Sequence, residues 1–222
     1  MRKIWIVGLA TIILAGCAAL PRGESTFTEM EDSDMNENTS AVDTLPGQLL
    51  FDFQSGTPSW SSVDDSVMGG VSQSASRVLD EGVLEFSGTM SLENNGGFAS
   101  IRSPWNPIDL SEYDGILIRV LGDGQVYRLR IRTAATGSEV AYNSLFETQD
   151  GEWTTVYIPF ETMIPTFRGF RAPVGGLDAR AVTSLGLMLS DKQPGAFSLQ
   201  VDWIRAVSEG EILTRLMPTQ EA

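Results

Sequence analysis

Short runs in which apolar and polar residues alternate occupy the chain from residue 47 onward. The clearest run covers residues 125–133, where Tyr127, Leu129 and Ile131 fall on one side of an extended strand and three arginines on the other. Three further runs show the same period of two: 116–120, 154–160 and 197–203. No run of comparable length has the spacing of an amphipathic helix, so the pattern predicts a domain of half-buried strands.

Glycine, asparagine and aspartate separate these runs. The segments at 94–97 (NNGG), 122–124 (GDG) and 150–151 (DG) supply residues that accept the positive φ angles of tight turns. Pro159 should end its strand, because proline has no amide hydrogen to donate to a neighbouring strand. Many short strands joined by tight turns predict an antiparallel β-sandwich or barrel at 47–207. We expect a short extension at 208–222, with one helical turn around 212–217.

The N-terminus has the features of a bacterial lipoprotein signal peptide. Arg2 and Lys3 precede an apolar run at 4–14, which is shorter than the roughly 20 residues of a membrane span. The sequence LAGC at 14–17 resembles a lipobox, which implies cleavage before Cys17, a diacylglycerol on its thiol and an acylated new amino terminus. Ala18 favours the outer membrane over the inner membrane. A plain signal peptide with a chance cysteine is the alternative.

Residues 18–46 are rich in acidic and small polar side chains, with Phe27 as their only aromatic residue. Such a segment buries too little apolar surface to fold by itself. We therefore expect a signal peptide at 1–16, a lipidated cysteine and solvated acidic tether at 17–46, and the β-domain at 47–207. An acidic segment that binds a partner is the alternative.

Charge and residue usage exclude several classes of function. The formal net charge is −14, from 15 basic and 29 acidic residues, which argues against a nucleic-acid partner. Histidine is absent and Cys17 is the only cysteine, so a Ser-His-Asp triad, the usual zinc ligands and an internal disulfide are unavailable to this chain. We therefore expect a protein that is not an enzyme.

An ordered set of segments resembles the complex I intermediate-associated protein 30 family. These segments follow one another in the order and spacing of that family: SVDDSVMGGVS (62–72), GVLEFSGTMSLENNGGFASIRS (82–103), DLSEYDGILIRVLGDGQVYRLRIR (109–132), GEWTTVYIPF (151–160), TFRGF (166–170) and SLGLMLSDKQPGAFSLQVDWI (184–204). The resemblance implies a galactose-binding-domain-like jelly-roll β-sandwich. It also implies a role like that of the mitochondrial members, which are chaperone-like assembly factors of NADH:ubiquinone oxidoreductase, with no catalytic residues to transfer.

The first of these segments contains two adjacent carboxylates and a pair of glycines. Asp64 and Asp65, followed by Met68, Gly69 and Gly70, form a candidate site for a ligand or a partner. A calcium ion is one candidate, because it accepts carboxylate and carbonyl oxygens. Adjacent side chains on a strand point to opposite faces, however, and both residue types favour turns. We therefore expect a structural turn, with no metal as the favoured prediction and calcium at the two aspartates as the alternative.

Arg128, Arg130 and Arg132 form the polar side of the clearest strand. Guanidinium groups make paired hydrogen bonds to carboxylates and phosphates, and residues 47–207 carry a net charge of −8, from 11 basic and 19 acidic residues. We therefore expect a solvated face whose arginines pair with acidic residues on neighbouring strands. A local binding surface for a ligand or partner, made by these three arginines, is the alternative.

Two tryptophans are candidates for the stacking contacts that carbohydrate-binding modules make with sugar rings. Trp60 and Trp105 lie in loop-like sequence contexts, whereas Trp203 belongs to an alternating run and should be in the core. Packing within the protein is the alternative for both loop residues.

These features together predict a lipid-anchored, non-enzymatic binding domain of the bacterial cell envelope. We expect it to engage a protein partner in an assembly or chaperone-like role, with no cofactor. A carbohydrate-binding module for a cell-wall or surface glycan is the alternative function.

Overall fold

The computed structural model describes residues 45–54, 59–137 and 139–215. The predicted signal peptide, the lipidated Cys17 and nearly all of the tether lie outside these residues. Within the described part of the chain, no helix has both the length and the apolar character required to cross a membrane.

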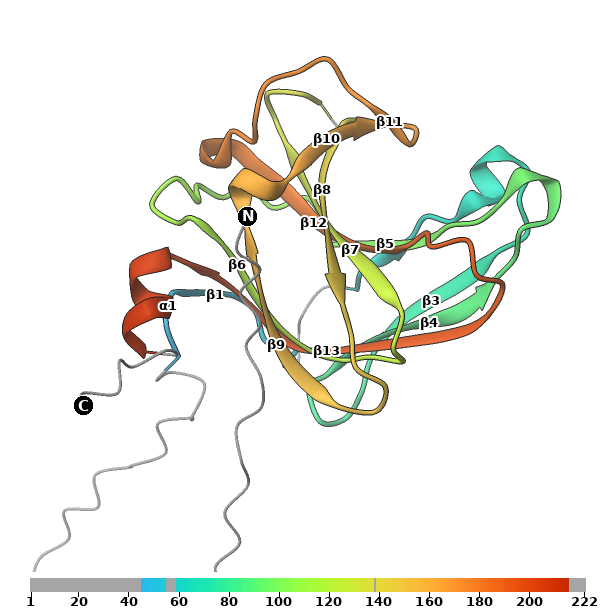
Figure 1. Ribbon diagram of the computed structural model, residues 1–222, viewed down its shortest axis with the longest axis horizontal. Coiled ribbons are helices and arrows are strands. Elements are labelled where there is room, and N and C mark those ends of the chain that lie inside the picture. The colour runs from blue at the N-terminus through green and yellow to red at the C-terminus, as the bar shows by residue number, and fades with distance from the viewer. Residues whose placement is uncertain (1–44, 55–58, 138, 216–222) are drawn as a thin grey trace, which may run out of the picture. The chain divides into compact units, whose positions relative to one another are not determined.

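Two antiparallel sheets pack face to face, as the sequence predicts for a β-sandwich (Figure 1). The six-stranded sheet has the order β3-β4-β13-β6-β9, and β1 also pairs with β13. Its strands are β1 (Gln48–Phe51), β3 (Gln73–Val78), β4 (Leu84–Met90), β6 (Gly115–Leu121), β9 (Trp153–Pro159) and β13 (Gly195–Val207).

The seven-stranded sheet has the order β11-β10-β8-β7-β12-β5-β2. Its strands are β2 (Ser61–Ser62), β5 (Ala99–Arg102), β7 (Val126–Thr133), β8 (Ala141–Glu147), β10 (Ile164–Phe167), β11 (Phe170–Arg171) and β12 (Val182–Leu189). Strands β7, β12 and β5 therefore lie next to one another, although β5 and β12 are about 80 residues apart in sequence.

The core lies between the sheets and is filled by the apolar positions of the alternating runs. Tyr127, Leu129 and Ile131 of β7 are fully buried there, as predicted. Phe86 packs edge to face on both Tyr127 and Phe197, with ring centroids 6.4 and 5.0 Å apart. The side of each strand that faces away from the core is then free to carry polar residues.

The alternation in β13 breaks at one position that the sequence pattern does not reveal. The pairing of β13 with β6 shifts register between Val201 and Trp203, and Ile204 takes the next core position. Trp203 is buried but lies outside the main hydrophobic cluster. The prediction that Trp203 is a core residue is therefore confirmed by its burial, although the bulge takes it out of the stripe formed by Leu199 and Val201.

The predicted turns and the end of β9 are confirmed. Positive φ angles occur at Asn94, Asn95, Gly97, Gly124 and Gly151. Strand β9 ends at its proline. The helical turn expected around 212–217 is a longer helix, α1 (Glu209–Arg215), which begins earlier than predicted.

Candidate functional site

The outer face of the seven-stranded sheet carries the arginine stripe. Arg128, Arg130 and Arg132 alternate with the core residues of β7 and therefore point away from the core. Their cross-strand neighbours on β8 and β12 are uncharged: Leu145 and Met188, Asn143 and Gly186, and Ser184. Within the described residues, Arg128 and Arg130 therefore lack the acidic partners expected on neighbouring strands.

A fourth arginine joins the stripe from β5. Gly186 of β12 lies opposite Arg130 on one side and opposite Arg102 on the other. A Cβ atom at Gly186 would come 3.7 Å from Arg130 Cβ and 3.8 Å from Arg132 Nη1. Arg132 therefore extends over the glycine, into the space between the other two. We call Arg102, Arg130 and Arg132 the arginine cluster.

Electrostatics in the arginine cluster are unfavourable in the free protein. Burial, followed by repulsion from neighbouring arginines, lowers the pKa of Arg130 to about 10 and that of Arg132 to about 9. Burial also lowers the pKa of Arg102. All three side chains still carry a positive charge at neutral pH, so the repulsion between them persists there.

Two guanidinium atoms of the cluster lack an acceptor. Arg102 Nε and Arg130 Nε are buried and have no hydrogen-bond partner among the described residues. Arg128 differs, because its Nε donates to Ser190 Oγ at 2.8 Å. None of the ion pairs found within the described ranges involves Arg102, Arg128 or Arg130.

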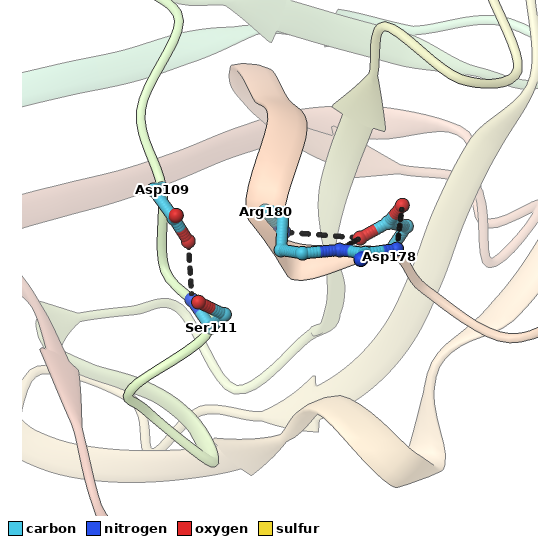
Figure 2. A network of polar contacts seen from close by, with 4 residues as sticks. All are labelled: Asp109, Ser111, Asp178 and Arg180. Carbon is cyan, nitrogen blue, oxygen red and sulfur yellow. Dashed lines mark hydrogen bonds and ion pairs between the residues drawn. The ribbon is translucent and has the colours of Figure 1, made fainter.

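Three arginines elsewhere in the described fold, Arg77, Arg119 and Arg180, have carboxylate partners, and Arg205 donates to the backbone carbonyls of Pro46 and Gly47. Figure 2 shows Arg180 and Asp178, which form two parallel contacts of 2.9 and 3.0 Å, with Asp109 nearby and bonded to the Ser111 amide. On the outer face of the other sheet, Arg119 pairs with Asp202 and lies over the Trp153 ring. Arg102 and Arg130 of the arginine cluster therefore differ from these arginines because no carboxylate lies beside them among the described residues.

A cavity of about 330 Å³ adjoins the cluster. Its lining includes Arg102, Arg132, Trp105 and the small polar residues Ser61 and Ser184. Trp105 follows β5 and is 64% exposed. The structure thus places this tryptophan beside two of the arginines, in a position to contact a ligand.

Trp60 has a different position. It is only 4% exposed and packs against Phe51 and Phe53, with ring centroids 5.2 and 6.0 Å away. The prediction that Trp60 contacts a ligand is therefore wrong. Its neighbours in sequence are loop-like, but its ring fills the end of the core.

Asp65 closes the loop between β2 and β3. Its carboxylate is fully buried and accepts hydrogen bonds from the Ser72 amide (2.9 Å) and hydroxyl (2.6 Å), and from the Gly97 and Phe98 amides (2.7 and 3.3 Å). Burial alone raises the pKa of this carboxyl, but the hydrogen bonds outweigh burial and hold the pKa below its usual value. Asp65 thereby ties this loop to the loop after β4, and both project from one end of the sandwich (Figure 1).

Asp64 also holds the loop in place through hydrogen bonds to its carboxylate. Its carboxylate accepts from the Ser74 amide and hydroxyl at 2.8 and 2.6 Å, and from the Ser100 amide at 3.1 Å. The two neighbouring aspartates therefore point to different segments, as expected for adjacent side chains: Asp64 bonds to β3 and β5, whereas Asp65 bonds to loop residues.

The two glycines of this loop are required for different reasons. Gly69 follows the 3₁₀ turn η2 (Asp65–Met68) with φ of 91° and open space around it. A Cβ atom on Gly70 would lie 2.4 Å from the Asp65 carboxyl carbon. Met68 is 60% exposed at the tip of the loop. No group of three or more potential metal-ligating side chains is found across 45–54, 59–137 and 139–215, and calcium remains a prediction.

Arg102 is the one member of the arginine cluster that the sequence pattern did not identify. It lies in a four-residue strand, too short for a convincing alternation. The strand order that brings it near β7 depends on contacts between residues far apart in sequence.

The fold defines the class of protein, a galactose-binding-domain-like β-sandwich, as predicted. A family 11 carbohydrate-binding module from Clostridium thermocellum, in complex with a β-1,3-1,4-mixed-linked tetrasaccharide, is similar with a TM-score of 0.58 and 19% identity, covering 74% of this chain and 96% of that one. The family 11 module of the cellulosomal cellulase Lic26A-Cel5E from the same organism gives 0.59 and 18%, with the same coverage. At these identities the likeness concerns the fold.

The family is shown by the sequence itself. Residues 49–201 match the model of the Complex I intermediate-associated protein 30 (CIA30) family, so the chain belongs to this family, as the ordered segments predict. The mitochondrial Complex I intermediate-associated protein 30 of Mus musculus is 32% identical over 101 residues, which are 43% of this chain and 31% of that protein. The match thus spans about a third of the length of the curated relative.

Proposed function

We propose that this protein is a lipid-anchored, non-enzymatic binding domain of the bacterial cell envelope that engages a protein partner through the arginine-bearing face of its seven-stranded sheet. Membership of a family whose mouse relative is named for association with complex I intermediates supports a role in assembly. The LAGC sequence ending at Cys17 supports the anchor, and Ala18 supports the outer membrane.

One observation carries the proposal: buried arginine atoms on this face have no acceptor among the described residues. The same face exposes Leu145 and Ile164, on the adjoining strands β8 and β10. Arginine and apolar side chains are enriched in the cores of protein interfaces, whereas lysine and acidic residues are depleted. A partner that docks on this face would bring acceptors to its guanidinium groups.

Affinity capture from solubilised membranes tests this function. We expect the native chain to recover an envelope protein in stoichiometric amount, and the double variant Arg102→Glu/Arg130→Glu to lose at least nine-tenths of it. Arg119→Glu, on the outer face of the other sheet, is the matched control and should retain the partner. Equal recovery by all three chains would exclude the arginine face as the interface.

The anchor is tested separately. Cys17→Ser removes the thiol that would carry the diacylglycerol, so we expect the variant protein to leave the membrane fraction or to accumulate as precursor. Membrane fractionation and the mass of the mature N-terminus measure this. An unchanged distribution between the membrane and soluble fractions would contradict lipidation.

Glycan binding is a second candidate function, supported by the exposed Trp105 ring beside the cavity of about 330 Å³. Aromatic rings stack on sugars, and hydroxyl side chains such as Ser61 and Ser184 can hydrogen-bond to them. A glycan array probed with the native chain and with Trp105→Ala measures this function. A signal that disappears in the variant would favour it, whereas an array without signal would exclude it.

A further inference from the structure

The arginine cluster is a defined site within the wider arginine face. Its three guanidinium groups come from two strands, β5 and β7, on either side of β12, where Gly186 adds no side chain of its own and Arg132 extends over the glycine. Neighbouring strands lie about 4.8 Å apart, so β5 and β7, which are separated by β12, lie about 10 Å apart, and their long arginine side chains can contact the same small ligand from opposite sides.

Like charges lie next to one another at this site, and a bound negative charge would relieve their repulsion. The lowered pKa values of Arg130 and Arg132 express the cost of burying like charges next to one another. Arg102 and Arg130 have no carboxylate partner among the described residues, and a guanidinium offers two parallel N–H donors that match both oxygens of a planar oxyanion. Arg180 makes this contact with the carboxylate of Asp178 in Figure 2.

We propose that the arginine cluster is a carboxylate-binding site in which the partner protein docks an acidic side chain. This inference rests on the proposed function. A carboxylate of a protein is favoured over a free anion, because Leu145 and Ile164 extend the same face with exposed apolar surface that a small ion would leave uncovered. A desolvated charged contact surrounded by apolar contacts is typical of an interface hot spot.

The site differs from a general electrostatic attraction. Residues 47–207 carry more acidic than basic residues, 19 against 11, so an acidic partner is repelled at long range and gains its energy only at close contact. Binding should therefore depend on individual arginines of the cluster and on their planar geometry, and Arg→Lys should not substitute fully.

A labelled hexaglutamate peptide is the probe, and its binding to the full lipidated chain in detergent is measured by fluorescence anisotropy. We expect saturable binding that is weakened at least tenfold in Arg102→Met and Arg130→Met and several-fold in Arg130→Lys. Arg119→Met removes an arginine that already has a carboxylate partner and should bind like the native chain. Thermal melts of each variant confirm that it is folded.

The outcomes separate this site from the proposed function. Absence of hexaglutamate binding, or equal binding by Arg130→Met, overturns the carboxylate site, while arginine-dependent capture of a membrane protein would still uphold the proposed function. Failure of both experiments overturns both. Arginine-dependent binding of an oligogalacturonate, without binding of hexaglutamate, would assign the site to an acidic glycan and overturn the protein carboxylate.

Discussion

Two groups of charged residues differ in whether the fold satisfies their hydrogen bonds: the aspartates of the loop between β2 and β3, and the arginines on the outer face of the seven-stranded sheet. Asp64 and Asp65 accept three and four hydrogen bonds from the chain itself. In the arginine cluster, Arg102 and Arg130 each bury an Nε atom that finds no acceptor among the described residues. The hydrogen bonds of the two aspartates are satisfied within the fold, whereas those of Arg102 and Arg130 are not fully satisfied among the described residues.

This difference separates a structural role from a binding role. A buried charge whose hydrogen bonds are satisfied holds its surroundings in place. A partly buried charge that lacks an acceptor costs stability, and such groups persist where a ligand supplies the missing contact. Substitutions in the two groups should therefore change stability in opposite directions.

Asp65→Ala should have the largest effect. It leaves the Ser72, Gly97 and Phe98 amides without their acceptor in a buried place, so we expect the free energy of unfolding to fall by about 3–5 kcal/mol. Denaturant unfolding followed by tryptophan fluorescence measures it. Asp80→Ala, at an exposed turn residue, is the control and should change stability by less than about 0.5 kcal/mol. A similar small loss for Asp65→Ala would refute its structural role.

Gly70→Ala should come next. The new Cβ would overlap the Asp65 carboxyl group at 2.4 Å, so we expect a loss of about 2 kcal/mol from overpacking. A Cβ on Gly69 would contact no other atom, so the only penalty for Gly69→Ala is the φ of 91°. We expect this substitution to lower the free energy of unfolding by about 1 kcal/mol. If Gly69→Ala proved the more damaging of the two, the contact with Asp65 would not be the reason for Gly70.

Arg130→Met should act in the opposite direction. It keeps much of the apolar stem and removes a charge that is repelled by its neighbours, so we expect a gain of about 1 kcal/mol in the free energy of unfolding. Arg119→Met, which breaks an exposed ion pair, should be neutral or slightly destabilising. A clear loss of stability in Arg130→Met would show that Arg130 is already satisfied in the free protein.

Calcium should have the smallest effect. The oxygens of Asp64 and Asp65 already accept hydrogen bonds from Ser74, Ser100, Ser72, Gly97 and Phe98, and a cation would have to displace these donors. We expect the melting temperature to be the same with calcium and with a chelator. A rise of several degrees in calcium would establish a site at this loop after all.

Much of the fold was predictable from local pattern. The alternation in β7 identified both its core residues and its arginine side, and the asparagine and glycine turns occur where the sequence predicted them. The direction of each β7 side chain was predictable because a strand has a side-chain period of two.

Other features depended on contacts that local pattern does not encode. Trp60 lies in a loop-like context yet fills the end of the core, and the bulge in β13 turns Trp203 away from the core stripe. Arg102 joins the arginine cluster only through the order β7-β12-β5. Each case requires knowing which distant segment lies alongside.

The sequence by itself determined the strands, the turns, the family and the residue types available for chemistry, because these follow from periodicity, from positive φ angles and from composition. The tertiary structure alone decided which charges are satisfied. Whether a carboxylate or a guanidinium finds a partner depends on strand order and register, which join segments up to about 80 residues apart. For this reason only the tertiary structure could assign a structural role to Asp64 and Asp65 and a binding role to the arginine cluster.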